Sequence, residues 1–239
     1  MADFSVLIPA AGRGTRAGLP YPKTLYPVDG TPILHRLLAV LSIYDPIPTV
    51  VVSPLGESLI RESLHQAGLD AHLVIQPEPR GMGDAVLRFE YSPVASEANH
   101  VLLAWGDLAH LQTSTVSILA KSHIDCDNDF TFPTRLVDRA YTQVQRDRAG
   151  RVVAVSETRE QGVTDPQPGE REIGLFAFRK QPVFEMLQAD LPGKLGSATC
   201  EHGFLYVIEH LARSGAKVEA LSIATELDLI SLNSICDLN

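Results

Sequence analysis

The stretch that decides the fold is Phe4–Arg16, which reads FSVLIPAAGRGTR. Its first half is an apolar run typical of a buried strand, and its second half is a glycine-rich loop. Glycines at positions 12 and 14 allow a positive φ and let a bound group approach the backbone, while the small Ala10 and Ala11 leave room above the strand end. The stretch therefore predicts a strand followed by a loop that cradles phosphate groups.

Three cations accompany this loop. Arg13 and Arg16 lie within it and Lys23 follows shortly after, a set that suits a polyphosphate. The loop is not a P-loop, because no Lys-Ser/Thr pair follows Gly14 at the required offset, and Ala17 takes the third glycine position of a dinucleotide-binding motif. A tight strand-to-loop turn remains the alternative, since glycine serves both purposes.

The composition is that of an ordinary globular chain. It has 239 residues, of which 45% are hydrophobic and 21% charged, and its net charge of −9 argues against a nucleic-acid partner. In such an acidic chain, a local group of cations indicates a small anionic ligand. The three cysteines are too scattered for a disulfide framework or a metal site, and no leader or long apolar run is found, so a cytoplasmic protein without a membrane partner is expected.

Strands and helices alternate along the first half of the chain. This rhythm predicts a mainly parallel α/β sheet of Rossmann type, covered by helices on both faces, with ligands bound at the carboxyl ends of the strands. The expected strands are 4–9, 50–52, 73–75 and 101–105, and the expected helices are 32–43, 56–67 and 83–92. The second half predicts a strand at 130–132, a hairpin of 142–147 with 151–156, a strand at 172–178, and helices at 180–189 and 202–214.

The opening loop resembles the signature of the sugar-1-phosphate nucleotidyltransferase family, L-A-A-G-x-G-T-R, then P-K and x-P-V-x-G-x-P-[ML]. The corresponding residues here are 8–16 and 22–34, and the similarity is greatest to the uridylyltransferase domains of bacterial N-acetylglucosamine-1-phosphate uridylyltransferases. The resemblance implies the nucleotide-diphospho-sugar transferase (GT-A-like) fold. It also implies one domain over 1–239, with a nucleotide-binding half at 1–125 and an acceptor-binding half at 126–239.

Two further motifs follow strand ends. The segment Gln76–Ala85 reads QPEPRGMGDA, where the family has Q-x-x-x-x-G-T-G-[DH]-A, and the match implies that Gln76 and Gly81 contact a nucleobase, with uracil or thymine favoured. A glutamine amide can pair with a base edge, and glycine lets the base approach, although a glycine-capped turn before a helix explains the same residues. Met82 replaces the family's threonine.

Asp107 ends the fourth strand, where the family has the aspartate that holds its metal. A carboxylate there can bind Mg²⁺, which prefers oxygen ligands and bridges phosphate oxygens; a helix cap or a solvated turn is the alternative. The family's second metal ligand corresponds to Asn233, which a helix N-cap explains equally well.

The acceptor side matches the family less closely. The resemblance implies that Glu157 contacts acceptor hydroxyls, that Arg159 lies near the acceptor phosphate in place of a lysine, and that Glu172 replaces the asparagine that touches the sugar. An expected G-Y-G segment becomes Ala140-Tyr141-Thr142. The departures from the family pattern cluster on this side.

The implied reaction moves a nucleoside monophosphate from a triphosphate, UTP by the resemblance, to a small phosphorylated acceptor such as a sugar 1-phosphate, and releases pyrophosphate. Arg16 would hold the leaving phosphates, Lys23 would neutralise the α-phosphate, and Asp107 would hold Mg²⁺. The triphosphate would be cradled by Ala10, Ala11, Gly12, Gly14 and Thr15. Phosphoryl chemistry of this kind needs positioning and charge neutralisation more than acids or bases.

Two alternatives to this reaction stay open. One is a cytidylyltransferase for a non-sugar phosphate, and the other is a nucleotide-binding module that has lost catalysis. The sequence is compatible with a homo-oligomer and with a domain that is part of a longer chain.

Overall fold

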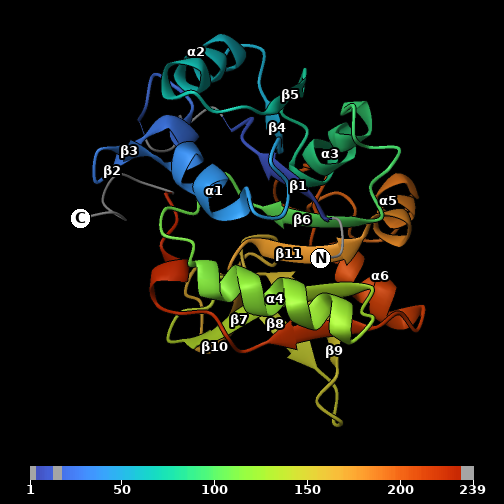
Figure 1. The fold of residues 1–239 in the computed structure, drawn as a ribbon. Helices are drawn as coiled ribbons and strands as arrows, with labels where there is room; N and C mark the ends of the chain where they lie inside the picture. The colour runs from blue at the N-terminus through green and yellow to red at the C-terminus, as the bar shows by residue number, and fades with distance from the viewer. Residues whose placement is uncertain (1–3, 13–17, 233–239) are drawn as a thin grey trace.

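The computed structural model describes residues 4–12 and 18–232. Its centre is a four-stranded parallel sheet in the spatial order β5-β4-β1-β6 (Figure 1). The bounds are β1 Phe4–Pro9, β4 Thr49–Val52, β5 His72–Ile75 and β6 His100–Ala104. These short apolar runs have no polar face because both sides of the sheet are covered, as is usual for parallel sheets.

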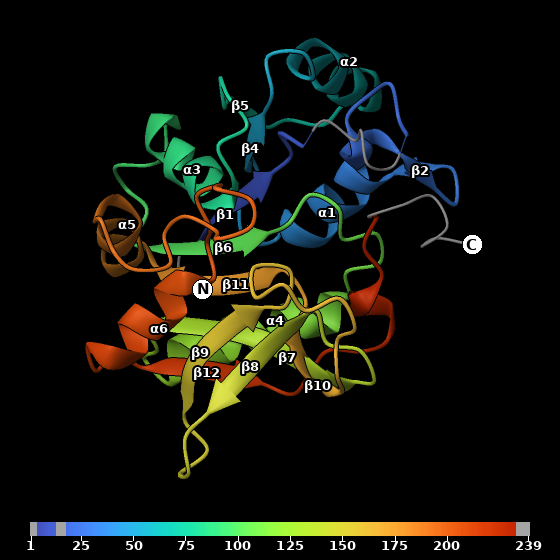
Figure 2. The same cartoon turned by 180° about the vertical axis from the view of Figure 1, so that it is seen from behind.

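Helices cover the two faces of the sheet in two groups (Figures 1 and 2). Alternation along β1 divides its side chains, so that Val6 and Ile8 join one hydrophobic core and Leu7 joins the other. The first core is closed by α1 (Ile33–Leu41), α2 (Glu57–Ala67) and α4 (Thr113–Asp125). The second core is closed by α3 (Met82–Leu87), α5 (Lys180–Gln188) and α6 (Tyr206–Arg213).

The second half of the chain extends the same sheet with mixed polarity. Strand β11 (Leu175–Arg179) is antiparallel to β6 and to β7 (Phe130–Val137). Strand β7 also pairs with β12 (Val218–Leu221), in parallel, and with β10 (Gly169–Glu172), antiparallel. Phenylalanines gather beneath this region, where Phe176 and Phe204 have ring centroids 5.2 Å apart. The sheet therefore continues from the first half of the chain into the second.

A hairpin of β8 (Thr142–Arg146) and β9 (Val152–Glu157) lies outside the main sheet. Val152 and Val155 anchor β9 to the second core, and the tip of the hairpin extends away from the body of the protein (Figure 2). The remaining elements are short: β2 (Pro27–Val28), β3 (Thr31–Pro32), and 3₁₀ helices at Lys23–Leu25, Arg88–Tyr91 and Leu227–Leu229.

The expected fold class is confirmed, with differences in detail. The strand expected at 172–178 is two strands, because Gly174 adopts a φ of 83° and turns the chain between β10 and β11. The helix expected from 202 begins at Tyr206, since the backbones of His202 and Gly203 bond to other segments instead. Helix α3 ends at Leu87 and continues as a 3₁₀ turn. The sequence did not lead us to expect α4 or β12.

No helix in the described part of the chain combines the length and the apolar character that crossing a membrane requires.

Two leucines offer a test of the first core. Leu34 on α1 is fully buried, whereas Leu55 is 79% exposed. We expect Leu34→Ala to lower the free energy of unfolding by about 2–5 kcal/mol, because it removes buried methyl groups and leaves a cavity. The control Leu55→Ala should stay within about 0.5 kcal/mol of the wild type. Urea denaturation of both variants measures these changes, and equal losses would contradict this assignment of the core.

Candidate active site

The site lies where the order of the parallel strands reverses. The chain runs from β1 outward to β4 and β5 and then returns to β6 on the other side of β1, which creates a crevice at the carboxyl ends of β1 and β6. Gly106 closes this crevice at its base by donating its N–H to the carbonyl of Pro9 at 3.2 Å. A Cβ at Gly106 would lie 2.6 Å from that oxygen, so only glycine allows the approach.

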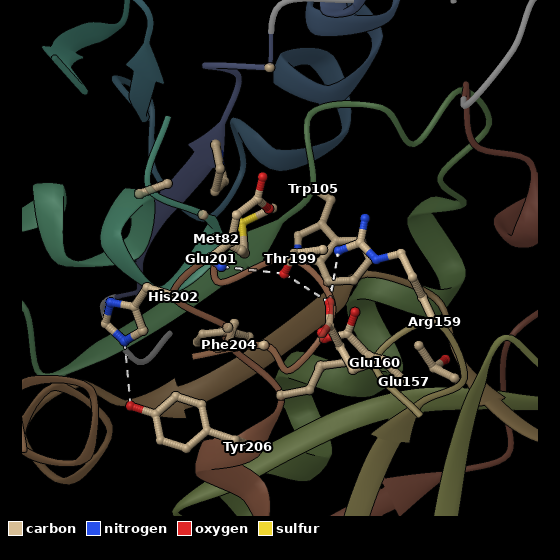
Figure 3. Close-up of a pocket in the computed structure, with 18 of the residues that line it drawn as sticks. Met82, Trp105, Glu157, Arg159, Glu160, Thr199, Glu201, His202, Phe204 and Tyr206 are labelled. Atoms are coloured by element: carbon tan, nitrogen blue, oxygen red, sulfur yellow. Dashed lines mark hydrogen bonds and ion pairs between the residues drawn. The ribbon is translucent and has the colours of Figure 1, made fainter. Parts of the chain in front are cut away.

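A cavity of about 870 Å³ opens from this crevice and crosses to residues from the second half of the chain (Figure 3). It is lined at the crevice by Ala11, Gly12, Lys23, Trp105 and Asp107, on the α3 side by Gln76, Gly81 and Met82, and on the far side by Glu157, Arg159, Glu160, Thr199, Glu201 and Tyr206. The cavity is thus bounded by segments that come from both halves of the sequence.

Lys23 and Asp107 form an ion pair at the crevice. Lys23 begins a 3₁₀ turn that brings its side chain next to Gly12, where an added Cβ would lie 3.7 Å from Lys23 Cε. Its Nζ also lies 3.4 Å from the carbonyl oxygen of Leu232. The side chain of Asp107 is 12% exposed and that of Lys23 is 28% exposed, so the two charges are partly shielded from water. Each ion therefore compensates the other until a charged ligand enters.

Asp107 has the properties of a ligand for a hard cation. One carboxylate oxygen accepts from Lys23, while the other, Oδ1, is buried without a hydrogen-bond partner among the described residues. The backbone N–H of Leu232 donates to the carbonyl of Asp107 at 3.0 Å, so the chain that leads into Asn233 is fixed beside Asp107. No cluster of three or more His, Cys, Asp or Glu in the described ranges could hold a metal by itself. Mg²⁺ commonly takes one or two protein ligands and completes its shell with phosphates and water.

Gln76 and Gly81 form the wall of the cavity next to α3. Gln76 follows β5 and is 5% exposed. Gly81 has a φ of 107°, and a Cβ there would lie 2.4 Å from the carbonyl oxygen of His202. The N–H of His202 donates to Arg80 O at 2.7 Å, and Gly83 N–H donates back to His202 O at 2.9 Å. This wall is therefore built against a segment from the second half of the chain.

Glu157, the last residue of β9, and Arg159, two residues further on, lie on the opposite wall. Burial raises the pKa of the Glu157 carboxyl, and the nearby Arg159 guanidinium partly offsets this effect. Glu160 forms an ion pair of 3.4 Å with Arg159 (Figure 3). Its carboxylate also accepts from Ala198 N at 2.8 Å and from Thr199 Oγ1 at 2.9 Å, which fixes the segment 193–201 over the cavity.

Glu172 does not line the cavity. It is 1% exposed and its carboxylate accepts from the Thr142 hydroxyl at 3.1 Å and from the N–H of Gly174. Burial raises the pKa of Glu172 to about 7, although both hydrogen bonds favour the charged form. The side chain supports the backbone turn beneath the cavity, and its neighbour Thr142 is the residue that lines the wall.

The structure brings most of the expected site residues to one cavity. Ala11, Gly12, Lys23, Gln76, Gly81, Asp107, Glu157 and Arg159 line it. Ala10 lies just beneath, where its N–H donates to Val51 O at 2.7 Å. Gly14, Thr15, Arg16 and Asn233 lie outside the described residues.

Sequence reasoning missed the segment 193–201, which contributes to the roof of the cavity. Gly193 and Gly196 signal a loop there, but nothing local indicates which surface that loop covers. At Gly196 an added Cβ would lie 2.5 Å from Glu160 Oε2, a requirement that only the folded structure reveals. Trp105, whose ring packs against Gly174, was also missed as a wall of the cavity.

The class of protein follows from comparison with known families. The model of the MobA-like NTP transferase domain matches residues 6–211. The chain belongs to this family of nucleotidyltransferases.

Curated relatives and solved structures are consistent with this assignment. The chain is 30% identical to the bifunctional protein GlmU of Koribacter versatilis, over 97% of this chain and 51% of the relative. It is 31% identical to GlmU of Azotobacter vinelandii, over 94% of this chain and 46% of that relative. The chain thus spans about half the length of these relatives.

Among solved structures, the inositol-1-phosphate CTP transferase from T. maritima has a TM-score of 0.74 at 18% identity, with 100% of this chain and 93% of that chain covered. A UDP-glucose pyrophosphorylase complexed with UDP-glucose has a TM-score of 0.69 at 15% identity, with 92% of this chain and 90% of that chain covered. At these identities the likeness shows the shared fold alone.

The raised pKa of Glu172 predicts a pH-dependent stability. The folded state holds this proton more tightly than the unfolded chain, whose glutamate has a pKa near 4.5. The stabilising contribution is therefore complete below pH 4.5 and is lost as the pH rises through about 7. Glutamine does not titrate, so the free energy of unfolding of Glu172→Gln should not fall in this pH range. We therefore expect the variant to become more stable relative to the wild type by about 2–3 kcal/mol as the pH rises from 4.5 to 7.

Urea denaturation at several pH values measures this difference. The control Glu97→Gln, at an exposed glutamate, should show no such trend. A difference between Glu172→Gln and the wild type that does not change with pH would contradict the buried titration.

Proposed function

We propose that this protein transfers a nucleoside monophosphate from UTP to a small phosphorylated acceptor, a sugar 1-phosphate, with release of pyrophosphate. The observation that carries this proposal is the cavity that joins the Lys23–Asp107 pair, next to the glycine loop, to the Glu157 and Arg159 wall. Membership of an NTP transferase family and the likeness to GlmU relatives support it. We also propose that residues 1–125 bind the nucleotide and 126–239 the acceptor within one domain.

The site suits a direct in-line transfer. An oxygen of the acceptor phosphate attacks the α-phosphorus, the bond from that phosphorus to the bridging oxygen breaks, and pyrophosphate leaves with the electron pair. Lys23, released from Asp107 by the entering nucleotide, neutralises the charge on the α-phosphate, and Arg16 and the loop N–H groups hold the leaving phosphates. Arg159 and Glu157 position the acceptor through its phosphate and hydroxyls. We propose that Glu172 acts on the acceptor indirectly: it accepts a hydrogen bond from Thr142 and so orients that residue, which lines the cavity.

The residues at the crevice fit Mg²⁺. The buried Oδ1 of Asp107, which has no hydrogen-bond partner among the described residues, is available as an oxygen ligand, and Asn233, which follows Leu232 in the sequence, is the proposed second ligand. When bound, the ion would supply neutralisation of phosphate charge.

A cytidylyltransferase for a non-sugar phosphate is the second candidate. Its support is the overall likeness to the inositol-1-phosphate CTP transferase, together with the altered acceptor wall, in which Glu172 turns away from the cavity. A nucleotide-binding module without catalysis is less well supported, since both Lys23 and Asp107 are present at the crevice.

Pyrophosphate release tests the proposal. The wild type should release pyrophosphate with UTP, Mg²⁺ and a sugar 1-phosphate from a panel that also contains polyol phosphates. Lys23→Ala should lower kcat by about 10²–10³-fold because it removes a charge that acts in the transition state. Lys121→Ala, at a lysine whose side chain is 75% exposed, is the matched control and should keep full activity.

The outcomes separate the candidates. Release with CTP and a polyol phosphate would favour the cytidylyltransferase, and nucleotide binding without release for any acceptor would favour the inactive module. Turnover of a folded Lys23→Ala variant within about threefold of the wild type would contradict the role of Lys23.

A further inference from the structure

The side-chain amide of Gln76 is held in one orientation. Its Nε2 lies 2.8 Å from Asp84 Oδ2 and 3.1 Å from the carbonyl oxygen of Gly81. A backbone carbonyl and an ionised carboxylate can only accept hydrogen bonds, so the NH₂ group must face them and both of its N–H donors are used. The remaining polar atom, Oε1, has no partner among the residues described here, and Gln76 lines the cavity.

Asp84 is itself held as an anion. Arg88, one turn further along, donates to Oδ1 of Asp84 through Nη2 at 2.7 Å, and its Nε lies 3.4 Å from Oδ2. Burial alone would raise the pKa of Asp84, but the hydrogen bonds from Arg88 and Gln76 outweigh this effect and lower the pKa. Asp84 therefore has no proton to donate at neutral pH and cannot exchange roles with the amide.

We propose that Asp84, held by Arg88, is a positioning residue that presents Gln76 Oε1 to the nucleotide as a hydrogen-bond acceptor and so selects the base. The inference rests on the proposed function, in which the cavity binds a nucleoside triphosphate. When ring position 3 of a pyrimidine faces this oxygen, uracil and thymine donate to it through N3–H. Cytosine carries a lone pair at N3, which would face the lone pairs of Oε1.

The cost of the wrong base is set by this fixed geometry. With a freely rotating glutamine, the amide would turn over and donate to the N3 of cytosine, because amide groups carry both a donor and an acceptor. Here that rotation would break two hydrogen bonds and bring an amide oxygen against two acceptors. Leaving buried polar groups mispaired weakens binding by about tenfold to hundredfold. The Asp84–Arg88 pair thus acts on nucleotide choice without touching the nucleotide.

The test is the ratio of affinities for two nucleotides. Dissociation constants for UTP and CTP with Mg²⁺ are measured by calorimetry for the wild type, Asp84→Asn and the control Glu78→Gln, which removes an exposed carboxylate from the same loop. The wild type and the control should prefer UTP by at least about tenfold. Asp84→Asn should lower this preference severalfold without abolishing it, because an asparagine amide can donate to the glutamine as well as accept from it, whereas the Gly81 carbonyl still accepts only from Nε2.

If Asp84 had a purely structural role, Asp84→Asn would weaken the binding of UTP and CTP equally and leave the ratio of their dissociation constants unchanged. Because Asp84 is buried and the variant could fold poorly, Arg88→Met provides a second measurement. It removes the guanidinium that keeps Asp84 ionised against desolvation, so the carboxyl is held less firmly as an acceptor, and the ratio should fall in the same direction by a smaller factor.

An unchanged ratio in folded Asp84→Asn or in Arg88→Met would overturn the inference, as would a wild type that prefers CTP. A wild type that binds neither nucleotide would overturn the proposed function and this inference together. Preference for UTP without pyrophosphate release would contradict the proposed function and still support the role of Asp84.

Discussion

The close approach of the chain at the ends of β1 and β6 is the constraint on which the site depends. Gly106 lies so near Pro9 that any side chain would collide with a backbone oxygen, and this contact places Asp107 in the same cavity wall as Gly12. Lys23 completes the arrangement, since its ammonium compensates the Asp107 carboxylate in a partly dry crevice. Removal of either ion would leave a shielded charge without its partner. The pair therefore links the stability of the crevice to its chemistry.

The cavity depends equally on contacts that cross between the two halves of the chain. The loop before α3 is paired with His202 through two backbone hydrogen bonds, and Glu160 holds the segment 193–201 by its N–H and hydroxyl groups. The wall that faces the proposed base and the roof over the proposed acceptor are thus parts of one hydrogen-bonded assembly.

Two buried carboxylates, Asp84 and Glu172, have pKa values shifted in opposite directions. Asp84 has an arginine partner, and its pKa is lowered although burial opposes this. Glu172 has hydrogen bonds from Thr142 and Gly174, and burial prevails and raises its pKa to about 7. The difference follows from burial and from contact: Glu172 is the more deeply buried and feels Arg171 only as a nearby charge, whereas Arg88 donates hydrogen bonds directly to Asp84. One carboxylate thus fixes an amide beside the cavity, and the other supports a turn beneath it.

The sequence by itself determined the parallel half of the fold and the strand ends from which the site is built. Short apolar runs, glycine residues in turns and helical periodicity are local signals, and they predicted the strands β1, β4, β5 and β6 and the positions of Gln76 and Asp107 at strand ends. Only the tertiary structure decided what pairs across the chain. It divided 172–178 into two strands at Gly174, turned Glu172 inward, folded 193–201 over the cavity, and fixed the Gln76 amide through Asp84 and Arg88. These features depend on contacts between groups that are distant in the sequence. A local sequence pattern does not indicate which of those groups a polar side chain will contact.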